Sequence, residues 1–580
     1  MPLASPERVS SPRSSPVGAP QGGAPEWFPI ELGLRHHALM LAFVLVAGLA
    51  IVGPGSVFMS DEAAGIAQAR TIVEHGGWAG EPAFPEVDPE GQWFPVIYAT
   101  ATEGGPAPLV KHPVFSALQA AGYAVQGRTG VYLLSVFGTT AAAVLAALTA
   151  RRIRDDIAVA TLWVVGVGSP LLFDAYLALA HSLAAAVAAA LFLAGLRARG
   201  STRWSTIWLV VPPAVVGPLL RSEFLILILA LAVSVVISSR RETVGRAAAT
   251  AGLLGLGGAF GLWADGVLTG WILGSGPVAA NVPTSGELGW LQGRIEGFVT
   301  TWLQPGYLGT ASEGLAVLAT VLVVGAALQL RLGRRTDDQM QLVLALAGIA
   351  LGLRIAGGAL SPIPGILLAF PLLPVGLMLF QRRQLESEPT VLAVSTSVLF
   401  ALGLLATQWP QGGSGEWGWR YFAVAIPILT PVLVGSVRGA FEKWAVPHRI
   451  RVLSVGVLAV WSLLAIGALR AVHQVNDQVV ADTEALVAGV DPGDGGEPVL
   501  ITTTDQIGRL AWADADRTRW LRVPTSDLAE VQARLAASGV EQWVLLALPE
   551  DDAVSRLVGG RVERLGETAG GGWELMVVGS

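Results

Sequence analysis

The chain has 580 residues, of which 52% are hydrophobic and 14% are charged. Soluble domains carry about 25% charged residues, so this composition excludes an ordinary soluble protein and indicates a polytopic membrane protein. The formal net charge of -7 is less informative than the placement of the charges. The absence of cysteine excludes disulfide bonds and thiolate metal sites.

The N-terminal segment, residues 1–34, opens with a stretch rich in Ser, Pro and Gly and is predicted to be disordered. It lacks the charged-then-apolar layout of a signal peptide. The first apolar run, 38–58, has no small-residue cleavage pattern after it. We therefore predict that this run is retained as a membrane span.

Apolar stretches recur along residues 35–475, and crossing a bilayer takes about 20 apolar residues. The two stretches on either side of Arg221 are short, so a single broken or re-entrant feature is the alternative there. The sequence predicts about thirteen spans, at 38–58, 129–150, 157–174, 178–196, 205–220, 223–239, 247–268, 309–330, 339–357, 364–380, 390–407, 421–438 and 451–470.

The short loops between these spans show a consistent charge asymmetry. Every second loop is basic, and basic loops stay in the cytoplasm. The sequence therefore predicts a multi-pass protein of the plasma membrane with a cytoplasmic N-terminus. Long outside loops are then expected at 59–128 and 269–308, and the tail also lies outside. The basic loops are those around 151–154, 197–199, 239–241, 331–335, 381–383 and 438–451.

The first outside loop is predicted to hold two helices that lie on the membrane surface. Residues 60–76 have an amphipathic pattern, with Ser60 as the expected N-cap. Residues 111–126 form the second helix, with Pro113 in its first turn, where proline is tolerated. The loop at 269–308 is predicted to contain a helix near 288–302.

The tail, residues 485–580, differs from the rest because strand and helix patterns alternate. Strands are predicted at 498–503, 542–548 and 573–578, and helices at 526–537 and 551–558. This order predicts a small extracytoplasmic α/β domain attached to a mainly α membrane protein. The tail has no glycine-rich phosphate loop.

Asp61 and Glu62 follow the first span at the expected boundary between membrane and water. A carboxylate there suits a general base that takes a proton from an attacking hydroxyl. The competing interpretation is structural, because acidic residues stabilise the positive end of a helix dipole. Both interpretations fit the local sequence.

Other polar residues of the predicted outer face are candidates for substrate binding. Lys111 and His112 suit a phosphate leaving group or, alternatively, lipid headgroups. Arg221 and Glu223 are ionisable residues between apolar segments, and such residues are often functional, although they also neutralise each other. Arg354 lies within an apolar run and either binds a phosphate or snorkels to the interface.

The late outer loop contains Glu416, Arg420 and Tyr421. Aromatic rings, a carboxylate and a guanidinium together suit sugar and phosphate recognition, and the alternative is an interfacial aromatic belt. Asp174 and His181 flank a tight turn and are predicted to be a solvated turn. No motif for a protein-bound metal is present, although Mg²⁺ or Mn²⁺ held mostly by a substrate phosphate fits the sequence.

Four motifs in this order resemble those of the GT-C class of membrane glycosyltransferases, particularly the protein O-mannosyltransferase and lipid A aminoarabinose transferase-like branch. The resemblance covers about residues 35–440. The motifs are Ser60-Asp61-Glu62-Ala63, Lys111-His112-Pro113-Val114, Leu219-Leu220-Arg221-Ser222-Glu223 and Trp417-Gly418-Trp419-Arg420-Tyr421.

The resemblance implies a GT-C-like fold and transfer of a sugar from a polyprenyl-phosphate carrier to an outside acceptor. Asp61 then takes the catalytic acidic position, with Glu62 as its neighbouring candidate, and Lys111 and Arg221 contact the donor phosphate. The expected partners are a polyprenyl-phosphate-linked sugar, membrane lipids and a glycan, lipid or protein acceptor, and no nucleic acid. A transporter or flippase for a lipid-linked sugar and a non-catalytic assembly protein remain as alternatives.

Overall fold

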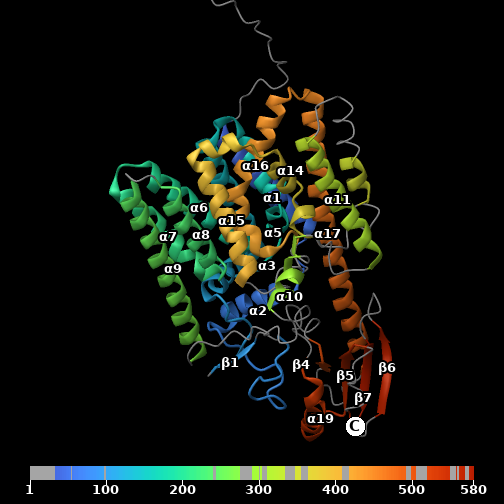
Figure 1. The fold of residues 1–580 in the computed structure, drawn as a ribbon. Coiled ribbons are helices and arrows are strands. Elements are labelled where there is room, and N and C mark those ends of the chain that lie inside the picture. Colours follow the sequence, from blue (N-terminus) through green and yellow to red (C-terminus); the bar gives the residue numbers. More distant parts are fainter. Residues whose placement is uncertain are drawn as a thin grey trace, which may run out of the picture.

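A computed structural model describes the chain from residue 33 to residue 579, with gaps. The described residues are 33–53, 55, 57–96, 99–102, 104–239, 243–274, 290–298, 301–302, 310–332, 346–353, 364–407, 417–490, 498–504, 519–548, 557, 561–567 and 574–579. Helices standing side by side make up most of this structure, and a small sheet lies at one end (Figure 1). The predicted mainly α class with a small C-terminal α/β part is confirmed.

The helices follow one another along most of the chain. The first group is α1 (Leu34–Val52), α2 (Ser60–His75), α3 (Pro113–Ile153), α4 (Ala158–Gly166), α5 (Leu171–Asp174), α6 (His181–Gly200), α7 (Val211–Leu220), α8 (Phe224–Ile237) and α9 (Val244–Leu273). The second group is α10 (Trp290–Phe298), α11 (Thr310–Leu332), α13 (Ile366–Ala369), α14 (Leu372–Leu379), α15 (Glu388–Thr407), α16 (Ile426–Lys443) and α17 (His448–Ala488).

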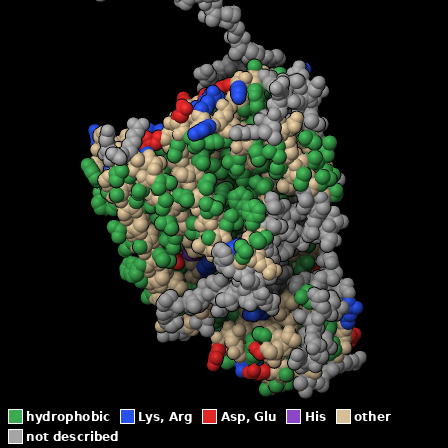
Figure 2. Space-filling model, viewed as in Figure 1, with side chains coloured by type: hydrophobic (Ala, Val, Ile, Leu, Met, Phe, Trp, Pro, Cys, Tyr) green, Lys and Arg blue, Asp and Glu red, His purple; other side chains and the backbone are tan. Residues whose placement is uncertain are grey.

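In the part of the chain that the structure describes, seven helices are long and apolar enough to cross a membrane. They are α1, α3, α6, α9, α15, α17 and the segment Arg420–Lys443 that contains α16. Figure 2 shows hydrophobic side chains in a broad band between two ends that carry charged residues. The chain is thus a multi-pass membrane protein, whereas the predicted count of thirteen spans is not confirmed.

Several predicted spans are interrupted or divided helices. The extended backbone of Arg221, at φ -157°, separates α7 from α8. The span predicted at 157–174 is divided between α4 and α5, and the one at 364–380 between α13 and α14. At each interruption one helix ends and another begins, so backbone N–H and C=O groups without partners inside a helix lie there.

The α3 helix joins the second predicted loop helix to the second span through a sharp bend. Gln126 and Gly127 leave the helical conformation, and Gly127 has φ 57°, which favours glycine. The bend brings Gly122 against Gly130, where a Cβ on Gly122 would lie 2.7 Å from the Gly130 carbonyl oxygen. The predicted helix at 111–126 is therefore the first arm of α3.

The α2 helix has the predicted bounds. Most of its residues from Glu62 to Thr71 are buried, and it packs against α3. That the helix lies at the membrane surface stays a prediction. The N-cap is Met59, without a side-chain capping hydrogen bond, so the prediction that Ser60 caps the helix was wrong.

The C-terminal part contains a five-stranded mixed sheet of order β4-β3-β5-β7-β6. The strands β3, β5 and β7 agree with the prediction, whereas β4 and β6 were missed. Apart from Leu557, the helix predicted at 551–558 lies outside the described residues. The bounds are β3 (Val499–Thr502), β4 (Arg519–Arg522), α19 (Leu528–Ala537), β5 (Gln542–Ala547), β6 (Arg561–Glu567) and β7 (Glu574–Gly579), and a separate hairpin pairs β1 (Thr100–Thr102) with β2 (Gly105–Ala107).

Each face of the sheet is covered by a different element. Alternate residues of a strand point to opposite faces. Val499 and Ile501 pack with α19, whereas Leu500 packs with the C-terminal end of α17. The helix α17 therefore belongs both to the helical bundle and to the core of the C-terminal part (Figure 1).

The loop between α2 and β1 also packs on the C-terminal part. Phe84, Val87 and Trp93 lie in the same apolar cluster as α19 and the sheet. The Arg522 backbone N–H donates to the Trp93 carbonyl oxygen at 2.7 Å. The Arg534 guanidinium lies 4.7 Å from the centre of the Trp93 ring. Residues more than 400 positions apart thus form one core.

Candidate active site

The site is built on the turn between α1 and α2, which we call the Asp61 turn and define as residues 57–62. Asp61 and Glu62 occupy the first turn of α2. Successive helical residues point about 100° apart, so the two carboxylates face different surroundings. The Asp61 side chain is 29% exposed, whereas Glu62 is fully buried.

Glu62 connects three segments inside the protein. Its carboxylate accepts hydrogen bonds from the backbone N–H groups of Phe58 and Ala178, both at 2.6 Å. The hydroxyl of Tyr132 on α3 donates to it as well. Both oxygens of Glu62 thus accept hydrogen bonds from the protein, and the carboxylate links the start of α2 to α3 and to the turn that contains Ala178.

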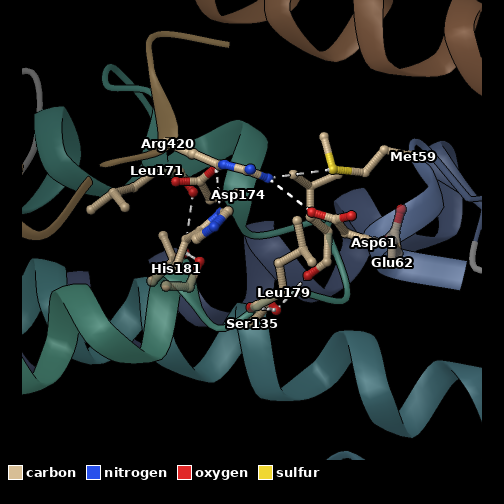
Figure 3. Close-up of polar contacts among 12 residues, drawn as sticks. Met59, Asp61, Glu62, Ser135, Leu171, Asp174, Leu179, His181 and Arg420 are labelled. Carbon is tan, nitrogen blue, oxygen red and sulfur yellow. Dashed lines mark hydrogen bonds and ion pairs between the residues drawn. The ribbon is translucent and has the colours of Figure 1, made fainter. Parts of the chain in front are cut away.

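Asp61 is paired with Arg420, which lies 359 positions later in the chain. Arg420 Nη1 is 3.1 Å from Asp61 Oδ2, and the Arg420 side chain is 20% exposed. The same nitrogen lies 4.0 Å from the Met59 sulfur (Figure 3). The two charged groups are thus paired with each other and both partly accessible.

Tyr421 brings a second guanidinium to the site. The Cζ atoms of Arg221 and Arg420 lie 5.6 Å and 5.4 Å from the centre of its ring. Arg221, at the break between α7 and α8, forms an ion pair with the buried Glu223. Four of the sequence-predicted residues are therefore connected to Asp61 in one cluster: Arg420 directly, Tyr421 and Arg221 through Arg420, and Glu223 through Arg221.

Lys111 belongs to the same cluster. Its residue is partly accessible to solvent, yet protein surrounds much of the side chain. This burial and the nearby guanidiniums of Arg221 and Arg420 lower the pKa of Lys111, against the opposing effect of Asp61 and Glu223. An accessible ammonium with two guanidiniums nearby is a suitable contact for a phosphate.

Backbone strain marks two positions next to these cations. Among the described residues, His112 and Trp419 are two of three non-glycine residues with positive φ, at 54° and 63°. They directly follow Lys111 and precede Arg420. Such conformations cost of order 1–3 kcal/mol and concentrate at functional sites. His112 Nδ1 also lies 3.6 Å from Asp265 on α9, so its side chain is paired away from Asp61.

Asp174 and His181 were predicted to be a solvated turn, and that prediction was wrong. Both side chains are buried, and His181 Nδ1 lies 3.9 Å from Asp174 Oδ1. Figure 3 shows the Asp174 carboxylate between the Arg420 side chain and the His181 ring. Two side chains of α3 hold the turn between them: Gln119 donates a hydrogen bond to the Ala178 carbonyl oxygen, and Ser135 donates one to the Leu177 carbonyl oxygen.

Two predicted site residues, Arg354 and Glu416, lie outside the described residues. Within the described part of the chain, no three His, Asp or Glu side chains are grouped so as to hold a metal ion. A Mg²⁺ or Mn²⁺ at the cluster would therefore need most of its ligands from a substrate phosphate. The predicted role of such an ion stays a prediction.

No protein-family model and no curated protein matches the sequence. Solved structures do match it. ArnT from Cupriavidus metallidurans in the apo state is 12% identical, with a TM-score of 0.49, over 94% of this chain and 98% of that chain. The same protein bound to undecaprenyl phosphate is 13% identical, with a TM-score of 0.44 over the same shares.

The Archaeoglobus fulgidus oligosaccharyltransferase in complex with Zn and sulfate is also similar. It is 13% identical, with a TM-score of 0.48, over 88% of this chain and 68% of that chain. Both proteins are GT-C membrane glycosyltransferases, the class that the sequence motifs resemble. TM-scores below 0.5 describe a partial likeness, so the function is argued next from the site itself.

Proposed function

We propose that this chain is an integral membrane glycosyltransferase that uses a polyprenyl-phosphate sugar as donor. The observation that carries the proposal is the cluster of Asp61 with Lys111, Arg221 and Arg420, which joins a partly accessible carboxylate to three cations. A carboxylate suits the base, and cations suit the phosphate leaving group.

The proposed step forms one bond and breaks another. The acceptor hydroxyl oxygen attacks the anomeric carbon of the sugar, and its proton passes to the Asp61 carboxylate. The bond between the anomeric carbon and the phosphate oxygen breaks, and the electron pair leaves with the polyprenyl phosphate. Arg221, Arg420 and Lys111 stabilise the negative charge that develops on that phosphate. Both guanidiniums contact the ring of Tyr421.

The proposal includes a sidedness. The acceptor, a glycan, lipid or protein, approaches from the extracytoplasmic side, and the donor enters from the bilayer. The charge asymmetry of the loops supports this orientation. At the end of α3 far from α2, Arg154 is paired with Asp156 and Glu442 at 2.7 Å and 2.8 Å. These pairs lie on the proposed cytoplasmic side.

The direct test is Asp61→Asn in the purified full chain, with a polyprenyl-phosphate sugar and a labelled acceptor. We expect turnover to fall by at least about 100-fold, the lower range for loss of a positioned base. Asp155→Asn is the matched control, because Asp155 is exposed at the opposite end of α3. Near-normal turnover of Asp61→Asn would remove Asp61 as the base.

The same preparation in vesicles separates a transferase from a transporter. A transferase releases polyprenyl phosphate in step with acceptor glycosylation, and a flippase moves the intact donor across the bilayer without cleaving it. Adding and chelating Mg²⁺ or Mn²⁺ in this assay also shows whether a cation acts with the donor phosphate. Donor translocation without cleavage would contradict the proposed function.

A further inference from the structure

Asn476 on α17 holds the backbone of the Asp61 turn. Its side-chain Nδ2 lies 2.9 Å from the carbonyl oxygen of Val57 and 3.1 Å from that of Phe58. Both carbonyls precede α2, so they have no place in the hydrogen-bond pattern of that helix. A single side-chain amide carries two N–H groups and can serve both.

The same peptide segment is held from its other sides. The Phe58 N–H donates to Glu62 Oε2 at 2.6 Å, as described above. The Phe58 ring packs edge-on against Phe173, with centroids 5.1 Å apart, and Phe173 is followed directly by Asp174. The backbone three residues before Asp61 is thus fixed by α17, by α2 and by α5.

An uncharged donor suits this position. A Lys or Arg there would bring a further cation beside the Asp61 turn and compete with Arg420 for the Asp61 carboxylate. An Asp would set a carboxylate against two carbonyl oxygens, which repel it. The amide satisfies the two carbonyls and leaves the pairing of Asp61 with Arg420 unchanged.

We propose that Asn476 is a positioning residue for Asp61, an inference that rests on the proposed glycosyl transfer. It orients the Asp61 turn against Arg420 through the Val57 and Phe58 carbonyls, without contact to the substrate. The C-terminal end of its helix packs in the core of the sheet through Val479 and Val487. The helix α17 therefore contacts both the sheet of the C-terminal part and the turn that carries Asp61.

The test compares Asn476→Asp and Asn476→Ala with wild type in the full chain. Asn476→Asp keeps the size of the side chain and removes the donor. We expect kcat per folded molecule to fall by about 10- to 100-fold in both variants, because a 1 Å misplacement can cost about 100-fold. The KM for the polyprenyl-phosphate sugar should stay unchanged, since the phosphate contacts are intact.

Gln478→Ala is the matched control, because Gln478 lies on the same helix, is exposed and hydrogen-bonds only to Asp482 at 2.6 Å among the contacts described. It should have wild-type kcat. Normal kcat in both Asn476 variants, while Asp61→Asn is inactive, overturns the positioning role and leaves the proposed function standing.

Two further outcomes are also decisive. If both Asn476 variants yield less folded protein but the folded fraction has wild-type kcat, the role is structural and the inference is wrong. If Asp61→Asn is active, the proposed function fails, whatever the Asn476 variants do.

Discussion

Adjacent residues in the Asp61 turn have opposite environments. Asp61 is partly exposed and pairs with Arg420, whereas Glu62 is buried and accepts hydrogen bonds from two backbone N–H groups. The rotation between neighbouring helical residues produces this division. We propose on this basis that the substrate meets Asp61, and that Glu62 positions the backbone that carries Asp61.

The lowered pKa of Lys111 predicts a pH dependence of donor binding. The ammonium is charged below this pKa and loses its proton as the pH rises through it, so the KM for donor should increase at alkaline pH. Lys111→Arg should bind donor without this alkaline increase, because a guanidinium stays protonated. KM is measured across the alkaline range for both proteins. Identical profiles would show that another group titrates.

Glu62→Gln tests the positioning role of the buried carboxylate. A glutamine places an N–H₂ group against either the Phe58 or the Ala178 N–H, and one buried donor then lacks an acceptor. We expect a loss of about 1–3 kcal/mol in unfolding free energy, together with reduced turnover. Thermal unfolding in detergent measures the first effect.

Glu74→Gln on the same helix is the control for that substitution. Glu74 forms an exposed pair with Arg70 at 2.8 Å, and such pairs contribute about 0–1 kcal/mol. Equal losses in the two variants would contradict the special role of Glu62.

The sequence showed which residue types stand at the site but not which of them pair. Asp61, Lys111, Arg221 and Arg420 could be selected from their predicted place on the outer face and from the resemblance. Asp174 and His181 could not, because a short polar turn has the same local pattern whether it is solvated or buried. Only the packing of α6 and α3 around that turn decides its burial.

At the scale of elements, α2 shows why its burial was missed. Its apolar residues have an amphipathic spacing, which predicts a surface helix. Its small residues carry the opposite signal, because Ala63, Ala64 and Gly65 permit close packing. A Cβ at Gly65 would lie 3.1 Å from the Gln119 amide of α3. For α2, the content of small residues indicated burial, whereas the spacing of the apolar residues did not.

The bend in α3 supports a prediction about Gly122→Ala. The added methyl group would meet the Gly130 carbonyl oxygen at 2.7 Å, and backbone atoms cannot move aside easily. We expect a lower unfolding temperature and lower turnover, since the bend places Lys111 and α2. Gly245→Ala on α9 meets nothing within 4 Å and should be neutral or slightly stabilising. Unchanged stability of Gly122→Ala would show that the two arms separate readily.

At the scale of the whole molecule, the loop with Trp93 fastens the helical part to the C-terminal part. Trp93→Ala removes a buried ring from their shared core and should cost about 3–5 kcal/mol. We expect faster proteolysis of the C-terminal part and a lower unfolding temperature. Trp271→Ala is the control, because Trp271 on α9 is exposed. Equal protease resistance in the two variants would show that Trp93 is not a fastening point.

The C-terminal sheet illustrates a second limit of sequence reasoning. The central strands β3, β5 and β7 have apolar runs that identify them, and β3 and β5 pair in parallel as α/β connections require. The edge strands β4 and β6 begin with arginine and carry several charged residues. Charged residues are common on edge strands and weaken the strand pattern.

The α17 helix is longer than the apolar part of a bilayer is thick. Its 41 residues span about 60 Å at about 1.5 Å per residue, roughly twice the apolar thickness of a bilayer. Asn476 lies six residues beyond the predicted apolar stretch 451–470, which is about 9 Å along the helix axis. If the stretch 451–470 crosses the bilayer as predicted, this distance places the Asp61 turn, which Asn476 holds, at the level of the lipid headgroups. In the proposed reaction, the lipid-linked phosphate would then meet the cations without leaving its level in the bilayer, and the acceptor would approach from outside.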